Sequence, residues 1–284
     1  QRQMCIRDRT EEVYNQADIQ SRLKTKWVAH PLQFFDSIDS TNIRAKLEAE
    51  QGAKSGLLVV SDMQSAGRGR RGRSWESPAG TNIYYTLMLK PDFSSDCAPM
   101  LTLVMALAVA KGIRQTLRRD SEEAAAKVGI KWPNDIVVDG KKVCGILTEM
   151  SMEQGYIQHI VIGVGINVRK QEFPEEIRDR AAAIDEQCGF RISRSQLIAD
   201  IMEAFEEDYE IFLRTHDLKG LRASYAELLV NQDREVCVLD PKGEYRGIAR
   251  GINDQGELLV ERQDGTVEEV YAGEVSVRGI YGYV

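Results

Sequence analysis

Histidine and cysteine are both scarce in this chain of 284 residues. The 3 histidines lie far apart, and the 5 cysteines are scattered and never paired as Cys-x-x-Cys. Zinc sites and disulfide frameworks need such residues at close, repeated spacings, so the sequence argues against both and singles out no metal ligand. This cysteine usage is typical of a reducing compartment, and we expect a cytoplasmic protein.

The sequence also lacks a hydrophobic run long enough to span a membrane. Its longest apolar stretch, residues 98–110, is too short to cross a bilayer and indicates a buried helix. Residues 1–9 contain no apolar core, so they do not read as a secretory signal. Because the chain begins with Gln1 and not with methionine, we expect these nine residues to be foreign or to follow a truncation.

The chain also has fewer positive than negative charges. The formal net charge is −7, whereas a protein that coats nucleic acid needs a broad basic surface. Hydrophobic residues make up 43% of the chain and charged residues 29%, which is ordinary for a globular protein. The length leaves room for one medium and one small domain, and we expect neither a membrane nor a nucleic-acid partner.

Residues 34–230 alternate between strand and helix patterns. A helix is predicted at 98–117, because nearly every face of that segment is apolar. A Ser193-x-x-Gln196 capping box precedes a second helix, and Asp139-Gly140 is a strong hairpin signal. Strands are predicted at 34–39, 57–61, 82–90, 130–138, 143–150 and 156–168, with a short helix at 43–50.

Short strands separated by turns dominate the chain after about residue 231. They are predicted at 236–239, 246–252, 258–262, 266–271 and 275–280. This pattern of short strands and turns indicates a small all-β barrel. The chain is therefore divided into an N-terminal segment (1–33), a larger domain (34–230) and a C-terminal barrel (231–284).

An arginine loop, defined here as residues 64–76, carries four arginines within six positions of an otherwise acidic chain. Its alternating glycines allow the backbone to approach a ligand, and arginine binds phosphate or carboxylate with charge-assisted hydrogen bonds. A solvated loop or a nucleic-acid-binding RGG segment are the alternatives. The loop is short and lies between two apolar strands, which favours an anion-binding loop. No Gly-Lys-Ser/Thr follows, so it is not a P-loop.

Two further segments are ambiguous when each is taken alone. Lys131-Trp132-Pro133-Asn134-Asp135 could supply an aromatic platform and polar groups at a strand end, although a turn around a buried tryptophan is the simpler interpretation. Lys141 and Lys142 lead into an apolar strand, where lysines are usually just solvated.

Taken together and in order, these motifs resemble those of the biotin–protein ligases. The resemblance rests on Gly-Arg-Gly-Arg-Arg-Gly-Arg-x-Trp, Lys-Trp-Pro-Asn-Asp, Lys-x-Cys-Gly-Ile-Leu and Gly-x-Gly-Ile-Asn, and it runs from about Phe34 to the end of the chain. The fold that it implies is α+β: a mixed sheet flanked by helices, similar to class II aminoacyl-tRNA synthetases, followed by an SH3-like barrel.

The resemblance implies a reaction in two steps. Biotin and ATP, usually with Mg²⁺, form biotinyl-5'-AMP, and a lysine of a biotin carboxyl carrier domain of a biotin-dependent carboxylase then attacks this mixed anhydride. Both steps develop negative charge that fixed cations and N–H groups must meet. The sequence leaves the oligomeric state open, a homodimer included.

The resemblance also implies roles for single residues. Lys142, Arg68 and Arg70 are the expected catalytic cations. The residues expected to bind biotin are Ser40, Thr41, Asn42, Gln64, Gly67, Arg68, Lys142 and Gly145. Those expected on the nucleotide side are Arg70, Arg71, Trp75, Asn134, Asp135, Gly165, Asn167 and Arg278. Three simpler interpretations stay open: Ser40 as a helix cap, Gly145 as a packing glycine and Asn167 as a turn residue.

Three alternative functions stay open at this point. A lipoate–protein ligase has the same reaction and a related fold, although the intact arginine loop favours biotin. A repressor–ligase would carry an N-terminal winged helix-turn-helix, and the residues before Phe34 are too few for one unless a truncation removed it. A pure binding module would leave Lys142 without a role.

We expect no sequence-specific binding of duplex DNA by this chain. It shows no helix-turn-helix pattern, and its net charge of −7 repels the phosphate backbone. In a filter-binding assay, salt-resistant retention of a biotin-operon-like duplex would contradict this expectation.

Overall fold

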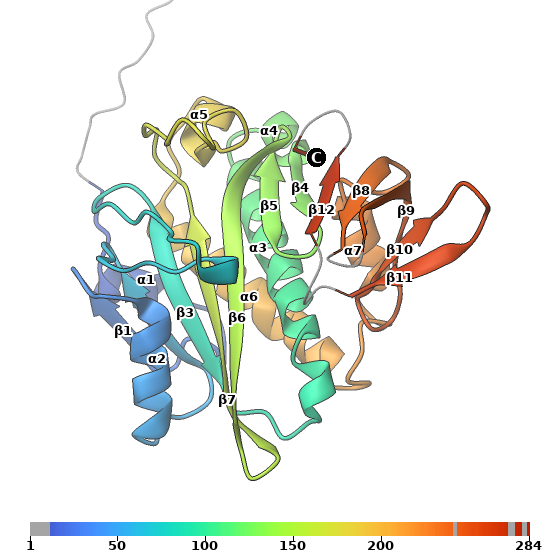
Figure 1. The fold of residues 1–284 in the computed structure, drawn as a ribbon. Helices are drawn as coiled ribbons and strands as arrows, with labels where there is room; N and C mark the ends of the chain where they lie inside the picture. Colours follow the sequence, from blue (N-terminus) through green and yellow to red (C-terminus); the bar gives the residue numbers. More distant parts are fainter. Residues whose placement is uncertain (1–11, 241–242, 272–275, 280–282) are drawn as a thin grey trace, which may run out of the picture.

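Most of the structure, a computed structural model of the chain, is built around one large sheet (Figure 1). The structure describes residues 12–240, 243–271, 276–279 and 283–284. The sheet has seven strands in the order β1-β2-β3-β7-β6-β5-β4. Their bounds are β1 Leu32–Phe35, β2 Leu57–Ser61, β3 Ile83–Leu89, β4 Val128–Lys131, β5 Asp135–Val138, β6 Lys141–Glu153 and β7 Tyr156–Ile166. Strands β1 and β2 are parallel and the other pairs antiparallel, which makes the sheet mixed.

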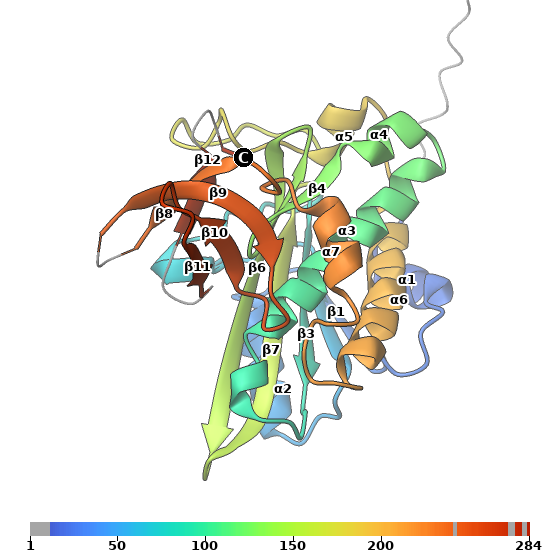
Figure 2. The ribbon, with the colours of Figure 1, turned by 90° about the vertical axis from the view of Figure 1, so that its right-hand side faces the viewer.

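Helices cover both faces of this sheet, as the two views show (Figures 1 and 2). Alternating residues of β2 separate the two layers: Leu57 and Val59 pack with helix α2 (Thr41–Glu50), while Leu58 and Val60 belong to the main core. The main core is formed largely by α3 (Met100–Arg118) and α6 (Arg194–Phe212). The shorter helices are α1 Gln16–Arg22, α4 Glu122–Ala126, α5 Ile184–Cys188 and α7 Arg222–Leu228, with single 3-10 turns at η1 Arg70–Gly72 and η2 Ser95–Cys97.

Helix α3 is the apolar segment that the sequence marks as buried. The stretch Ser95–Arg118 is long and apolar enough to cross a membrane by composition alone, but 72% of its most apolar window is buried inside the protein. A β-carbon at Gly112 would come within 2.5 Å of the Ile201 side chain, so α3 and α6 pack in close contact at this point. This is the behaviour of a core helix.

Five short strands form the second sheet, which lies beside the β4 edge of the first (Figure 2). Its order is β11-β10-β9-β8-β12, and every pair is antiparallel. The bounds are β8 Glu235–Leu239, β9 Tyr245–Ile252, β10 Leu258–Glu261, β11 Val267–Val270 and β12 Ser276–Gly279. The prediction of a mixed sheet followed by a small β domain is confirmed.

The sequence-based strand boundaries are wrong in two places. The strand expected at 34–39 ends at Phe35, and beyond it Ile38 makes an isolated bridge to Gln64. The strand expected at 130–138 is two antiparallel strands, β4 and β5, because residues 132–134 form a turn in which Pro133 has no N–H for a strand ladder.

Trp132 lies in that turn and does not form an aromatic platform. It is 2% exposed, and its indole N–H donates at 2.9 Å to the carbonyl of Gly256, in the turn between β9 and β10 of the second sheet. The simpler interpretation, a turn around a buried tryptophan, is therefore correct. The indole fixes the second sheet against the first.

Candidate active site

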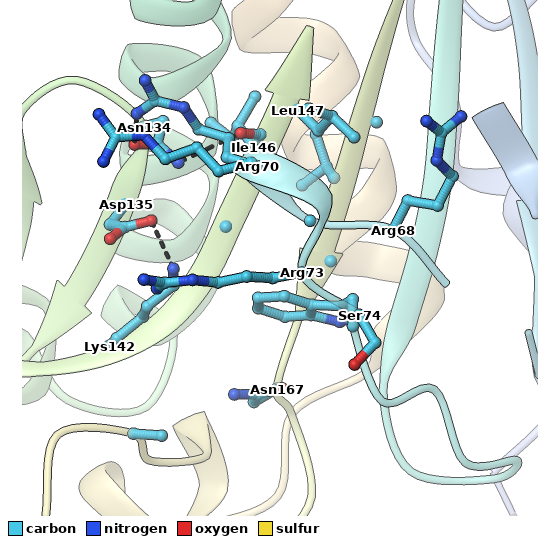
Figure 3. A pocket seen from close by; sticks show the side chains of 18 of the residues that line it. Arg68, Arg70, Arg73, Ser74, Asn134, Asp135, Lys142, Ile146, Leu147 and Asn167 are labelled. Atoms are coloured by element: carbon cyan, nitrogen blue, oxygen red, sulfur yellow. Dashed lines mark hydrogen bonds and ion pairs between the residues drawn. The ribbon is translucent and has the colours of Figure 1, made fainter. Parts of the chain in front are cut away.

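One cavity of about 300 Å³ brings most of the expected site residues together (Figure 3). It lies between the start of α2, the arginine loop and strands β5, β6 and β7. A volume of this size suits a small organic ligand. The expected residues that line it are Ser40, Thr41, Asn42, Gln64, Arg68, Arg70, Arg71, Trp75, Asn134, Asp135, Lys142, Gly145, Gly165 and Asn167.

Glycines on the two central strands allow side chains to lie flat on the sheet. Gly145 of β6 pairs with Gly165 of β7, and both face the indole of Trp75. A β-carbon at Gly165 would lie 2.4 Å from the indole nitrogen, and one at Gly145 would lie 2.8 Å from the ring. The packing interpretation of Gly145 is thus the one that this structure supports.

The arginine loop folds back on itself as a small hairpin. The N–H of Trp75 donates to the carbonyl of Gly67 at 2.9 Å, and that of Gly69 donates to Arg73 at 2.7 Å. A β-carbon at Gly67 would lie 2.3 Å from the carbonyl oxygen of Trp75, so only glycine fits there. Gly67 shapes the loop from just outside the residues that line the cavity.

This hairpin sends its arginines in different directions (Figure 3). Arg70 donates to the side-chain oxygen of Asn134 at 2.7 Å, and Arg73 points toward Asp135. Arg68 lies on the opposite side of the cavity, 3.5 Å from a carboxylate oxygen of Glu149. Arg68 and Arg70 thus both line the cavity, but from different sides.

The start of α2 offers hydrogen-bonding groups to the cavity. Ser40 occupies the N-cap position, but its side chain makes no capping hydrogen bond and is 2% exposed. Ser40 is thus the N-cap residue by position, and its carbonyl accepts from the N–H of Arg44 at 3.0 Å, but its hydroxyl does not cap the helix. The side-chain oxygen of Gln64 accepts from both the N–H and the hydroxyl of Thr41, at 2.9 and 3.1 Å.

Asn42 continues this polar group deeper into the protein. Its side-chain oxygen accepts from the hydroxyl of Thr86 at 2.6 Å, and its amide donates to Glu149 at 2.8 Å. A β-carbon at Gly163 would lie 2.1 Å from the Asn42 side chain, so β7 needs glycine here as well. The chain of bonds holds this end of the cavity in one fixed orientation.

Lys142 and Asp135 form an ion pair at the other end of the cavity. Their charged atoms are 2.6 Å apart, and the Lys142 side chain is 26% exposed. Burial alone would raise the pKa of Asp135, but the ammonium of Lys142, the hydroxyl of Tyr283 and the charge of Lys131 together hold this pKa below its usual value. Lys142 thus presents a fixed cation to the cavity.

Three other residues expected on the nucleotide side are Asn134, Asn167 and Arg278. Asn134 also donates to the carbonyl of Ile146 at 3.2 Å, which locks it beside Arg70. Asn167 is 6% exposed and follows β7 directly. Arg278 lies in β12, but its side chain is outside the residues that the structure describes.

Several lining residues were missed by sequence reasoning. Arg73 and Ser74 belong to the arginine loop, and their motif could have indicated them. Ile177, Arg180 and Ala181 come from an irregular loop that carries no motif. That loop joins the site through its backbone, since the N–H of Lys142 donates to the carbonyl of Arg180 at 2.7 Å.

The described residues include no group of three or more histidine, cysteine, aspartate or glutamate side chains able to hold a metal ion. The carboxylate of Asp135 is already bonded to Lys142 and to the hydroxyl of Tyr283. A magnesium ion brought by ATP would therefore depend mainly on phosphate oxygens, as is usual for this ion.

The fold and the site together are those of a protein ligase. Residues 34–167 match the model of the biotin/lipoate A/B protein ligase family, and residues 233–278 match that of the biotin protein ligase C terminal domain. The chain belongs to the biotin/lipoate A/B protein ligase family. The resemblance inferred from the motifs is confirmed.

Individual relatives agree with this assignment. The chain is similar to the bifunctional ligase/repressor BirA of Bacillus spizizenii, with 36% identity over 267 residues that cover 93% of this chain and 79% of that protein. It is also similar to the biotin–[acetyl-CoA-carboxylase] ligase of Paracoccus denitrificans, with 30% identity over 242 residues that cover 83% of this chain and 98% of that protein.

Solved structures show the same fold. The biotin protein ligase of Aquifex aeolicus in complex with biotin and ATP superposes with a TM-score of 0.73 and 29% identity, covering 87% of this chain and 98% of that one. The biotin protein ligase of Leishmania major in complex with biotinyl-5-AMP gives a TM-score of 0.54 and 26% identity, covering 85% and 98%.

Proposed function

We propose that this cavity activates biotin with ATP and then transfers it to a protein lysine, as a biotin–protein ligase does. The observation that carries the proposal is the convergence of the arginine loop and the Lys142–Asp135 pair on one cavity. The chain's membership of the ligase family supports the same conclusion. Biotin and ATP are the substrates, and Mg²⁺ enters with the phosphates.

The chemistry explains why cations surround one end of the cavity. A carboxylate is a poor acylating agent, so its oxygen attacks the α-phosphate of ATP and pyrophosphate leaves. Negative charge grows on the phosphate in that step and on the acyl oxygen in the next. Lys142, Arg70 and Arg73 line the cavity and would stabilise this charge.

The polar end of the cavity suits the ring of biotin. A cyclic urea presents one carbonyl acceptor and two N–H donors, and Ser40, Thr41, Asn42 and Gln64 offer both kinds of partner. We assign the ureido group to these residues, with Arg68 and Gly67 on the arginine loop closing over the chain of the ligand. Gly145 would accommodate the ligand once Trp75 shifts.

The nucleotide would occupy the opposite end of the cavity. Arg70, Arg71, Asn134 and Asn167 line the cavity, and we assign the phosphates and the ribose to them. Trp75 and Gly165 form its floor. We also assign Asp135 and Arg278 to this side.

The proposal also covers the acceptor protein, the cellular compartment and the domain boundaries. We assign the acceptor lysine to a biotin carboxyl carrier domain and the protein to the cytoplasm. The catalytic domain is placed at 34–230 and the C-terminal SH3-like domain at 231–284. A homodimer is compatible with this function, and sedimentation analysis with and without biotin plus ATP would establish the oligomeric state.

An adenylation assay with two acids tests the proposed substrate. Pyrophosphate release should depend on biotin, while lipoate at the same concentration should give little above the background. A lipoate-dependent rate equal to or above the biotin-dependent rate would reassign the chain to the lipoate ligases.

The arginine loop is expected to become more protected when ligand binds. It holds clustered positive charges that a bound phosphate would neutralise, so ligand should favour the closed loop. Limited trypsin digestion should cut between Arg68 and Arg73 in the free protein, and biotin plus ATP should slow that cleavage strongly. Equal cleavage rates under both conditions would count against loop closure.

A further inference from the structure

A residue that follows β12 in the sequence lines the active site. Tyr283, the penultimate residue, lines the cavity, and its hydroxyl donates to the carboxylate of Asp135. The ammonium of Lys131 lies 3.4 Å from the centre of the Tyr283 ring. A β-carbon at Gly140, in the turn between β5 and β6, would lie 3.5 Å from Val284, so the last residue packs against that turn.

Asp135 is therefore held from two sides. One of its oxygens lies 2.6 Å from the ammonium of Lys142, and the other accepts from the hydroxyl of Tyr283. With one oxygen in the ion pair and the other in the hydrogen bond, the carboxylate has one orientation, and it fixes the position of the Lys142 ammonium in turn. Lys131 is 6% exposed, and its ammonium lies over one face of the tyrosine ring and holds it in place.

We propose that Tyr283 is a positioning residue for Lys142 and acts through Asp135. The residue after β12 thereby completes the site in which the carboxylate of biotin is activated. This inference rests on the proposed function. Without the hydroxyl, one oxygen of a buried carboxylate has no partner, and the carboxylate is free to rotate or to take up a proton. Lys142 then loses the anion that holds it in place.

The pH dependence of the reaction distinguishes this role from a purely structural one. The charged or titratable groups around Asp135 are Lys142, Lys131, Arg70, Arg73, Cys144 and the hydroxyl of Tyr283, with Arg180 also near that hydroxyl. The hydrogen bond from Tyr283 helps to keep the pKa of Asp135 below its usual value. Removing this bond raises that pKa, so the acid limb of the activity profile moves to higher pH.

Tyr283→Phe removes the hydroxyl and keeps the ring on Lys131. In the biotin-dependent pyrophosphate release assay, kcat should fall roughly tenfold while KM for biotin changes little. The decrease in kcat on the acid side of the pH profile should begin at a higher pH than in the wild type. The control is Tyr156→Phe, whose side chain is 79% exposed at the start of β7 and which should match the wild type.

A double-mutant cycle tests whether the effect passes through Asp135. In an Asp135→Asn background, Tyr283→Phe should cause no further loss. The proposal is overturned if Tyr283→Phe retains the wild-type kcat, lowers kcat with an unshifted acid limb, or adds its full loss in the Asp135→Asn background. A wild-type chain that does not adenylate biotin would instead overturn the proposed function.

Discussion

Replacing Lys142 by methionine is expected to lower the rate of adenylate formation by roughly 10²–10³. The ammonium of Lys142 is the cation held by Asp135 at the cavity, and methionine keeps the length of the side chain without its charge. Negative charge develops on the α-phosphate in this step, so a fixed cation stabilises the transition state more than the ground state. Binding of biotin alone should weaken much less.

The neighbouring lysine provides a matched control for this experiment. Lys141 is exposed at the start of the same strand, and it lies outside the lining of the cavity. Lys141→Met should therefore retain near-wild-type pyrophosphate release. Thermal unfolding should show that both variants are folded. Unchanged pyrophosphate release by Lys142→Met would remove Lys142 from the mechanism.

Replacing Arg70 by glycine should change the fate of the adenylate more than its formation. The guanidinium of Arg70 bonds to Asn134 at 2.7 Å and so joins the arginine loop to the strand side of the cavity. Burial holds its pKa below the usual value, an effect that a bound phosphate would offset. Losing such a contact should speed release of the adenylate by roughly ten- to a hundredfold.

Released adenylate reacts with any accessible amine, so leakage can be measured directly. Each enzyme is mixed with biotin, ATP and serum albumin, and the albumin is probed with streptavidin. Glu76→Gly is the control, because it introduces glycine into the same loop at an exposed residue outside the lining of the cavity and leaves Arg70 intact. If Arg70→Gly still forms adenylate but labels albumin no more than the wild type does, Arg70 does not retain the intermediate.

Local signals in the sequence predicted much of the fold. Asp139 and Gly140 form the turn between β5 and β6 with φ values of 51° and 73°, as the hairpin signal indicates. The Ser193 side chain caps α6 by accepting from the N–H of Gln196. These features depend on residues close in sequence, which is why local patterns predict them.

The directions of side chains within the site could not be predicted in the same way. Arg68 and Arg70 are two residues apart, yet the hairpin geometry of the loop sends them to Glu149 and Asn134. Tyr283 meets Asp135 across 148 residues of sequence, and no local pattern marks such a contact. The geometry of the loop determines the directions of the two arginines, and the position of the second sheet determines the contact of Tyr283. Both depend on the complete fold.

The most direct test of the account is intact-mass analysis of a biotin carboxyl carrier domain after incubation with this protein, ATP, Mg²⁺ and biotin. The account predicts a mass gain of one biotinyl group on a single lysine, dependent on ATP and absent when that lysine is replaced by arginine. An unchanged carrier mass, or a gain only when lipoate replaces biotin, would contradict it.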